Sequence, residues 1–175
     1  MKVLGIAAAA LLLAAGSARA EVADQGPAGF QVRHVVLIAA PPAKVRAAAL
    51  DIGQWWSSGH TYSGDANNLS IDAAGCFCEK LPDGFVRHMT LVYSAPDALR
   101  LAGALGPLAT TGASGHLGLS FGKTADPNST QLVLTYDVGG YAKGGLAQTW
   151  AAPVDGVLGQ QVARLKKYVE TGKAQ

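Results

Sequence analysis

The sequence contains little of what several common classes of protein require. Its 175 residues include only two cysteines and four histidines, and 15% of its side chains are charged. No G-x-S-x-G string surrounds a serine and no G-x-G-x-x-G string follows an expected strand, so neither a serine hydrolase nor a dinucleotide-binding enzyme is supported. The histidines are too widely spread to show metal-ligand spacing, and we expect neither a metal nor a cofactor.

Once the first 20 residues are set aside, the sequence also lacks an excess of either positive or negative charge. Lys2, an apolar run over 3–15 and an A-x-A-like site ending at Ala20 predict a secretory signal peptide over 1–20, with an uncleaved anchor as the alternative. Its removal leaves 12 basic and 12 acidic residues in one domain over 21–175. We therefore expect a periplasmic or secreted protein with no nucleic-acid partner and no stable membrane insertion.

The two cysteines, Cys76 and Cys78, are separated by a single residue. Alternate Cα atoms of a strand lie about 6.6 Å apart on one face, which is near the upper limit for a disulfide. A strained bridge and two free thiols both suit this spacing. A metal site is the weaker interpretation, because no set of His or carboxylate side chains accompanies the pair.

Alternation of apolar and polar residues predicts the first strand over 30–39. Pro42 can then occupy the first turn of a short helix that continues over 43–50, because its missing N–H is not needed there. Asp51 is placed to cap a second short helix that runs into Trp55. The expected start of the domain is therefore one strand followed by two short helices.

Short runs bounded by turn residues predict further strands. They lie within 69–73, 76–81, 86–93, 99–103, 117–121 and 132–138. An apolar stripe at three- and four-residue steps predicts a long C-terminal helix, in which Pro153 either produces a kink or stands in the first turn. We expect an α+β domain in which a curved antiparallel sheet of about seven strands surrounds one long helix, with a cavity between them.

Three strings carry a family resemblance: VVLIAAPPAKVRAAALDIGQWW, GCFCEKLPDGFVRHMTLVYSAPDALRL and LTYDVGGY. With the order of elements, they resemble the START-like (SRPBCC) superfamily, in particular its polyketide cyclase/dehydrase and heat-shock-ATPase-activator-homologue group. The resemblance covers roughly residues 30–167 and implies the helix-grip fold. It also implies a cavity for apolar or aromatic small molecules, lipids or hormones. It brings no catalytic motif that transfers residue by residue.

One candidate for chemistry comes from the hairpin around Asp83-Gly84. A two-residue turn there places Glu79 directly opposite His88, on a face shared with Phe77. If that face lines the cavity, the carboxylate orients the imidazole toward a ligand and the pair suits a general base. The alternative interpretation is an ion pair on the surface of the sheet.

The adjacent tryptophans Trp55 and Trp56 point about 100° apart if they are helical. We expect one to pack in the core and the other to flank the cavity entrance with Tyr62, although both can also be core residues. His34 lies on the apolar face of the first strand, where it is either a core histidine or a ligand contact. The candidate ligand-binding residues are Trp55, Trp56, Tyr62, His34, Phe77, His88, Tyr136 and Trp150.

The leading hypothesis is an exported protein that binds an apolar or aromatic small molecule or lipid between the sheet and the C-terminal helix. A cyclase- or hydratase-like enzyme that uses Glu79 and His88 is one alternative, and a protein-interaction module is another. The sequence leaves the ligand and the oligomeric state open.

Overall fold

The computed structural model describes residues 20–174, so the expected signal peptide lies, except for Ala20, outside the described residues. The strands are β1 Ala20–Gly26, β2 Gly29–Ile38, β3 Leu69–Ile71, β4 Cys76–Leu81, β5 Gly84–Ala95, β6 Ala98–Ala102, β7 Gly112–Lys123 and β8 Thr130–Tyr141. The helices are α1 Pro42–Leu50 and α2 Leu146–Thr171, with 3-10 turns η1 Ile52–Gln54, η2 Ser58–His60, η3 Ala66–Asn68 and η4 Gly106–Thr110.

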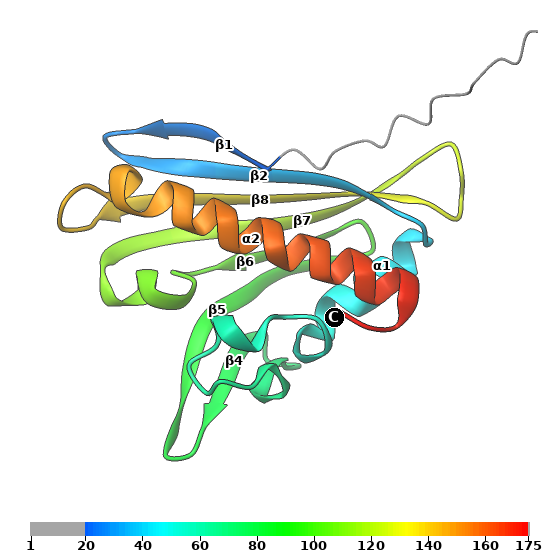
Figure 1. The fold of residues 1–175 in the computed structure, drawn as a ribbon, viewed down its shortest axis with the longest axis horizontal. Coiled ribbons are helices and arrows are strands. Elements are labelled where there is room, and N and C mark those ends of the chain that lie inside the picture. The colour runs from blue at the N-terminus through cyan, green and yellow to red at the C-terminus, as the bar shows by residue number, and fades with distance from the viewer. Residues whose placement is uncertain (1–19, 175) are drawn as a thin grey trace, which may run out of the picture.

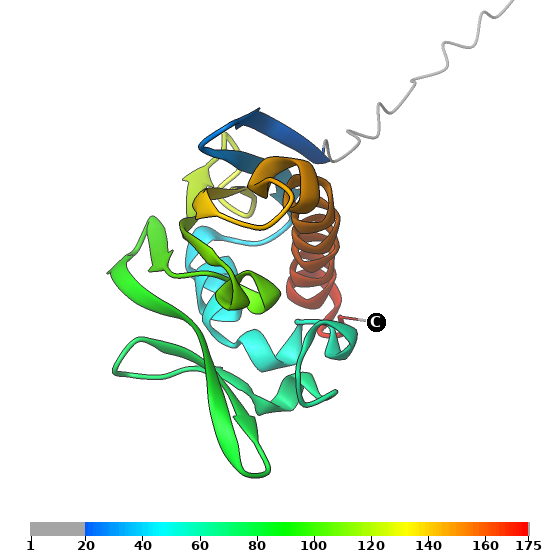
Figure 2. The ribbon, with the colours of Figure 1, turned by 90° about the vertical axis from the view of Figure 1, so that its left-hand side faces the viewer.

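The strands form one antiparallel sheet in the order β1-β2-β8-β7-β6-β5-β4-β3. The long helix α2 runs across one face of this sheet (Figure 1), and the end-on view shows the sheet curving around it (Figure 2). The expected α+β helix-grip fold is confirmed. The sheet has eight strands among the described residues, rather than the expected seven.

The strand that the sequence did not reveal is β1. It pairs with β2 through a tight turn, with Gly26 opposite Gly29 and Val22 opposite Val32. Most of its described side chains are exposed, and Val22 is the one that packs against the core. An edge strand with one apolar anchor lacks the alternation from which strands are recognised.

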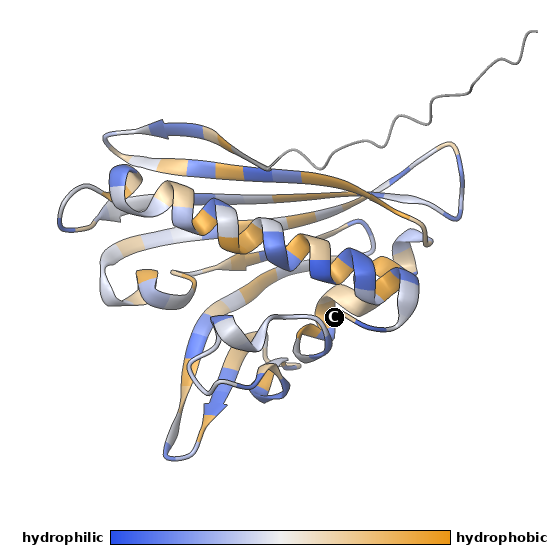
Figure 3. Ribbon diagram, in the orientation of Figure 1, coloured by the Kyte–Doolittle hydropathy of each residue, from blue (hydrophilic) through white to orange (hydrophobic). Residues whose placement is uncertain are grey.

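The central elements follow their sequence patterns. Along β2, alternate side chains from Phe30 to Ile38 are buried, as expected for a strand with one face on the core. Apolar and polar residues alternate along α2 (Figure 3), and its buried residues include Leu158 and Leu165. Pro153 lies inside α2, which begins at Leu146, so the alternative in which the proline stands in the first turn of the helix is wrong.

The segment after β2 differs in one respect from the expectation. The helix α1 is present, but the second helix is only the single turn η1, and the side chain of Asp51 makes no capping hydrogen bond there. Within the described residues, no helix is long and apolar enough to span a bilayer.

The helix α2 does not cover the whole sheet. It packs mainly against β2 and β1, while the β4–β5 hairpin projects away from it (Figure 1). The segment from η1 to η3 lies between this hairpin and the C-terminal half of α2 (Figure 1). The first half of α2 therefore has an apolar face that the sheet does not fully cover.

Candidate functional site

A cavity of about 320 Å³ lies beside the first half of α2. Its walls come from the loop around η2, from β3, β4 and β5, from the η4 segment, from β8 and from α2. The lining residues are Trp56, Gly59, His60, Thr61, Tyr62, Leu69, Phe77, His88, Leu105, Gly106, Pro107, Leu108, Tyr136, Trp150, Pro153, Val154 and Val157. Most of them are apolar or aromatic, which is the usual character of a small-molecule pocket.

Six of the eight candidate ligand-binding residues line this cavity. They are Trp56, Tyr62, Phe77, His88, Tyr136 and Trp150. The other two, Trp55 and His34, lie elsewhere in the core. The fold thus brings together residues from four segments that are far apart in the sequence.

Trp55 and Trp56 lie in different surroundings, as expected for neighbouring side chains that point in different directions. The indole N–H of Trp55 donates to the Ala48 carbonyl in α1 at 2.9 Å, and this ring is buried in the hydrophobic core. The indole N–H of Trp56 donates to the His60 carbonyl at 3.0 Å, and its ring meets the edge of Phe77 in the cavity wall. Only Trp56 of the pair is in contact with the cavity.

His34 faces α2 rather than the cavity. Its Nε2 atom lies 3.0 Å from Oδ1 of Asp155, and the imidazole is 3% exposed. Burial lowers the pKa of His34, against the opposing effect of the Asp155 carboxylate. The structure therefore places His34 beside a carboxylate of α2 and away from the cavity.

The β4–β5 hairpin has a different register from the expected one. The turn residues are Pro82 and Asp83, so Leu81 pairs with Gly84 and Glu79 pairs with Val86 instead of His88. Proline suits the second position of a turn because its φ is fixed there. A direct Glu79–His88 strand pair, as the sequence predicted, is therefore wrong.

A β-bulge nevertheless brings the two side chains together. The register shifts between Phe77 and Cys78, which leaves His88 as an extra residue on β5. At such a bulge, two residues of one strand oppose one residue of the other, and both His88 and Met89 are buried. His88 Nε2 lies 3.0 Å from Glu79 Oε2, so the expected contact is present through a diagonal arrangement.

A disulfide joins Cys76 and Cys78 next to this bulge, with their Cα atoms 5.3 Å apart. That separation is shorter than the roughly 6.6 Å of a regular strand, so β4 is contracted where its partner carries an extra residue. Of the alternatives left open by the sequence, the structure has the bridge. No group of three or more His, Cys, Asp or Glu side chains able to hold a metal ion occurs within residues 20–174.

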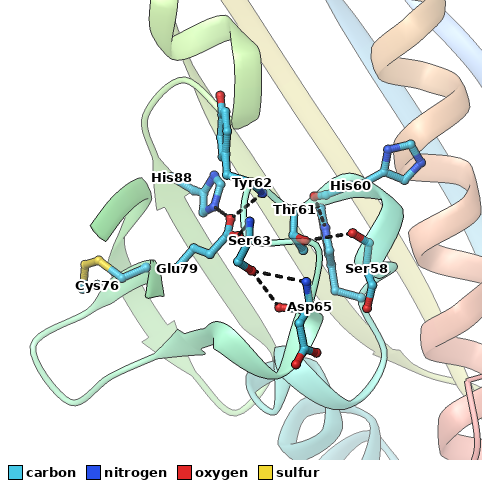
Figure 4. A network of polar contacts seen from close by, with 11 residues as sticks. Ser58, His60, Thr61, Tyr62, Ser63, Asp65, Cys76, Glu79 and His88 are labelled. Carbon is cyan, nitrogen blue, oxygen red and sulfur yellow. Dashed lines mark hydrogen bonds and ion pairs between the residues drawn. A yellow bond between two sulfur atoms is a disulfide. The ribbon is translucent and has the colours of Figure 1, made fainter. Parts of the chain in front are cut away.

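Glu79 is the centre of a polar network under the η2 loop (Figure 4). It is 0% exposed, and its carboxylate accepts hydrogen bonds from the backbone N–H groups of Tyr62 and Ser63 and from His88. Burial by itself raises the pKa of Glu79, but the hydrogen bonds from Ser63, Tyr62 and His88 outweigh it and lower the pKa below its ordinary value. The carboxylate is therefore ionised near neutral pH and ties the loop to β4.

The same loop is held from its other side by α2. The Ser57 N–H donates to Gln161 Oε1 at 2.9 Å, and the Arg164 guanidinium donates to the carbonyls of Trp55 and Trp56. These helix residues were not anticipated from the sequence. The one sequence feature that could have indicated this role is that Gln161 and Arg164 are polar residues three positions apart beside the apolar stripe of α2.

Tyr136 and the η4 segment form the wall opposite the loop. The Tyr136 hydroxyl accepts from the Leu105 N–H at 2.9 Å and donates to the Gly103 carbonyl at 3.1 Å. Burial raises the pKa of Tyr136 to about 12, so the hydroxyl stays protonated. A Cβ atom on Gly115 would lie 2.7 Å from Cε2 of this ring, so the absence of a side chain there leaves room for Tyr136.

No protein-family model matches the chain, and no curated protein matches it. Several solved structures are similar. A conserved protein of unknown function from Enterococcus faecalis has a TM-score of 0.56 at 19% identity, over 86% of this chain and 77% of its own. A protein from Arthrobacter aurescens has a TM-score of 0.56 at 14% identity, over 89% of this chain and 96% of its own.

CalU16 from Micromonospora echinospora is a third similar structure. Its TM-score is 0.50 at 12% identity, over 87% of this chain and 80% of its own. At such low identities these likenesses concern the fold alone. Together with the observed topology, they define the chain as a helix-grip domain.

Proposed function

We propose that this protein is an exported, START-like carrier or sensor that binds an apolar or aromatic small molecule or a lipid. The observation that supports the proposal most directly is the cavity of about 320 Å³ beside α2. Its lining, all of it within the described residues, contains aromatic and aliphatic side chains but no Lys, Arg, Asp or Glu. Burial of apolar ligand surface in such a site stabilises the complex by roughly 25 cal/mol per Å² before the costs of association are subtracted.

Contact quenching of tryptophan fluorescence tests this proposal. Bromobenzene, an apolar heavy-atom quencher, is expected to quench the wild-type emission in a saturable way, because Trp56 and Trp150 line the cavity. The variant Trp55→Phe is a matched control that should keep this quenching, whereas the double variant Trp56→Phe/Trp150→Phe should lose most of it. Quenching that rises linearly without saturation in all three proteins would mean that the cavity takes no ligand.

A second candidate is an enzyme in which Glu79 and His88 act as a general-base pair. It is favoured by one observation, the buried contact between Glu79 and an imidazole that lines the cavity. Native mass spectrometry of protein purified from its own host separates the two candidates. A co-purified molecule that fresh protein leaves unchanged supports carriage, whereas conversion of that molecule by wild-type protein, and not by His88→Ala, supports catalysis.

The exported location is part of the proposal and rests on the sequence of residues 1–20. N-terminal sequencing of the protein from the periplasm or medium is expected to start at Glu21. This cut removes only the first residue of β1, so the sheet is retained in the mature chain. Recovery of the protein with Met1 in a membrane fraction would favour the uncleaved anchor instead.

A further inference from the structure

The turn of the β4–β5 hairpin is not the one that its sequence favours. Its loop consists of Pro82 and Asp83, between the paired residues Leu81 and Gly84. Two-residue hairpin loops prefer turns in which the first central residue has a positive φ, which proline cannot adopt because its φ is fixed at about −65°. The string Pro82-Asp83-Gly84 suits a three-residue loop instead, in which a type I turn is followed by a residue with a positive φ.

Gly84 has no evident role in the observed register. Its φ is not positive, and a Cβ atom at this position would meet nothing within 4 Å. In a three-residue loop it would occupy the position with the positive φ, which glycine adopts without steric cost. The loop sequence therefore fits a second register of the hairpin better than the observed one.

This second register removes the shift between Phe77 and Cys78. Counting outward from a three-residue loop pairs Leu81 with Phe85, Lys80 with Val86, Glu79 with Arg87 and Cys78 with His88. The next pair is then Phe77 with Met89, which is already present in the structure. The second register is thus a ladder without a bulge beyond the loop, and it joins the rest of the sheet as the sheet stands.

The disulfide holds the hairpin in the observed register. A ladder continues pair by pair only where both strands rise equally, by about 6.6 Å over two residues. The Cα atoms of Cys76 and Cys78 are only 5.3 Å apart, and the register shifts at this point. Because the bridge encloses a single residue, it removes little conformational freedom from the unfolded chain. Its effect is therefore local, on the course of β4.

This part of β4 belongs to the cavity wall. Phe77, between the two cysteines, lines the cavity and lies against His88 with ring centroids 5.1 Å apart. His88 also lines the cavity, and it contacts Glu79 as the extra residue of the bulge. Directly opposed side chains share a face of the sheet, and successive ones alternate. In the second register His88 therefore moves to the face of Cys78, away from Phe77, and Arg87 takes its place beside Glu79.

We propose that the Cys76–Cys78 disulfide is a redox switch of the cavity. The oxidised protein binds the ligand, and reduction lets the hairpin slip by one residue, which removes His88 from the wall and releases the ligand. The inference rests on the proposed function, because it concerns the regulation of the same site.

The reductant in this proposal is a dithiol. Cys78 is the more exposed of the two cysteines, so the thiolate of the dithiol attacks the bridge there, forms a mixed disulfide and displaces Cys76. The second sulfur of the dithiol then closes its own disulfide and displaces Cys78. Two electrons and two protons pass from the dithiol to the protein, which is left with two cysteine thiols.

Nuclear magnetic resonance of the protein without ligand tests the slip directly. In the oxidised protein, the cross-strand nuclear Overhauser contacts of Glu79 are expected to be with Val86. After reduction by dithiothreitol they should be with Arg87, and the double variant Cys76→Ser/Cys78→Ser should show the Arg87 contacts without any reductant. A reduced protein that keeps the contacts with Val86, or that loses the hairpin altogether, would overturn the inference whatever the cavity binds.

Quenching by bromobenzene, measured with and without dithiothreitol, tests the effect on the cavity. Reduction is expected to weaken binding about fivefold or more, the usual size of a coupling between two sites. The double serine variant should bind as weakly as the reduced protein and should not respond to dithiothreitol. Equal affinities in the two redox states would overturn the inference and leave the proposed function standing. If the oxidised protein shows no saturable quenching, it is the proposed function that fails.

Gly84→Val separates the slip from a general loosening of the fold. Valine fits the observed register, in which φ is not positive and the space around the Cβ atom is open. It opposes the second register, because a β-branched residue is strongly disfavoured at a positive φ. The oxidised variant should bind bromobenzene like the wild type and should keep most of its affinity on reduction. A loss on reduction as large as that of the wild type would contradict the two-register mechanism.

Discussion

Replacement of Glu79 by alanine is expected to lower the free energy of unfolding by about 3–5 kcal/mol, because it leaves several donors without their acceptor at about 1–3 kcal/mol each. The change leaves the N–H groups of Tyr62 and Ser63 and the Nε2–H of His88 without an acceptor. Each of these donors must then either bind to water or remain unsatisfied, and an unsatisfied buried donor destabilises the folded protein. Urea unfolding followed by circular dichroism measures the loss.

Glu79→Gln is the matched control. It preserves the size of the side chain and one carbonyl oxygen, so part of the network survives and the loss should be smaller than in Glu79→Ala. Comparing the stability losses of the two variants separates the contribution of the carboxylate group from that of the side-chain volume. An alanine variant as stable as the wild type would show that the carboxylate does not hold the η2 loop.

The same residue predicts how stability depends on pH. Because the pKa of Glu79 is lower in the folded protein than its ordinary value of 4.5, the folded state binds the proton more weakly than the unfolded state. Its contribution is therefore fully present above about pH 4.5 and is lost as the pH falls through the folded-state pKa. A titration of stability from pH 7 to pH 3 should show this loss in the wild type, and a smaller loss in Glu79→Gln.

The contact between Glu79 and His88 shows how far the sequence alone leads. Alternation and a turn signal placed the two residues on one face of neighbouring strands. The strand register depends on which two residues form the turn. The bulge arises where the register shifts between Phe77 and Cys78, beside the disulfide. Neither feature has a local sequence signature, so the contact was predicted on the basis of a wrong strand pairing.

The parts of the fold with strong periodicity were predictable, and those that depend on distant partners were not. The patterns of β2 and α2 gave the sheet and the helix. The wall at η4 was hidden in a glycine-rich segment that resembles a loop, and it is fixed by the hydroxyl of Tyr136. His34 was left undecided because its partner, Asp155, lies on α2, far away in the sequence.

Replacement of Leu158 by alanine is expected to lower the free energy of unfolding by about 2–5 kcal/mol, as for other fully buried leucines. This side chain is 0% exposed and belongs to the core between α2 and the sheet. The neighbouring residue Val157 lines the cavity and is only partly buried. Its methyl groups face a space with few partner atoms, so Val157→Ala removes fewer dispersion contacts and is expected to cost less than about 1 kcal/mol.

The contrast between these two variants tests the cavity without a ligand. Both changes stand in the same stretch of α2, where helix propensity changes little and in the favourable direction on going to alanine. A large loss at Leu158 with a small loss at Val157 is the pattern of a helix that is packed on one side and open on the other. Equal large losses in urea unfolding would mean that the side chains around Val157 fill the space. The first half of α2 would then be an ordinary core element, with no room for a ligand.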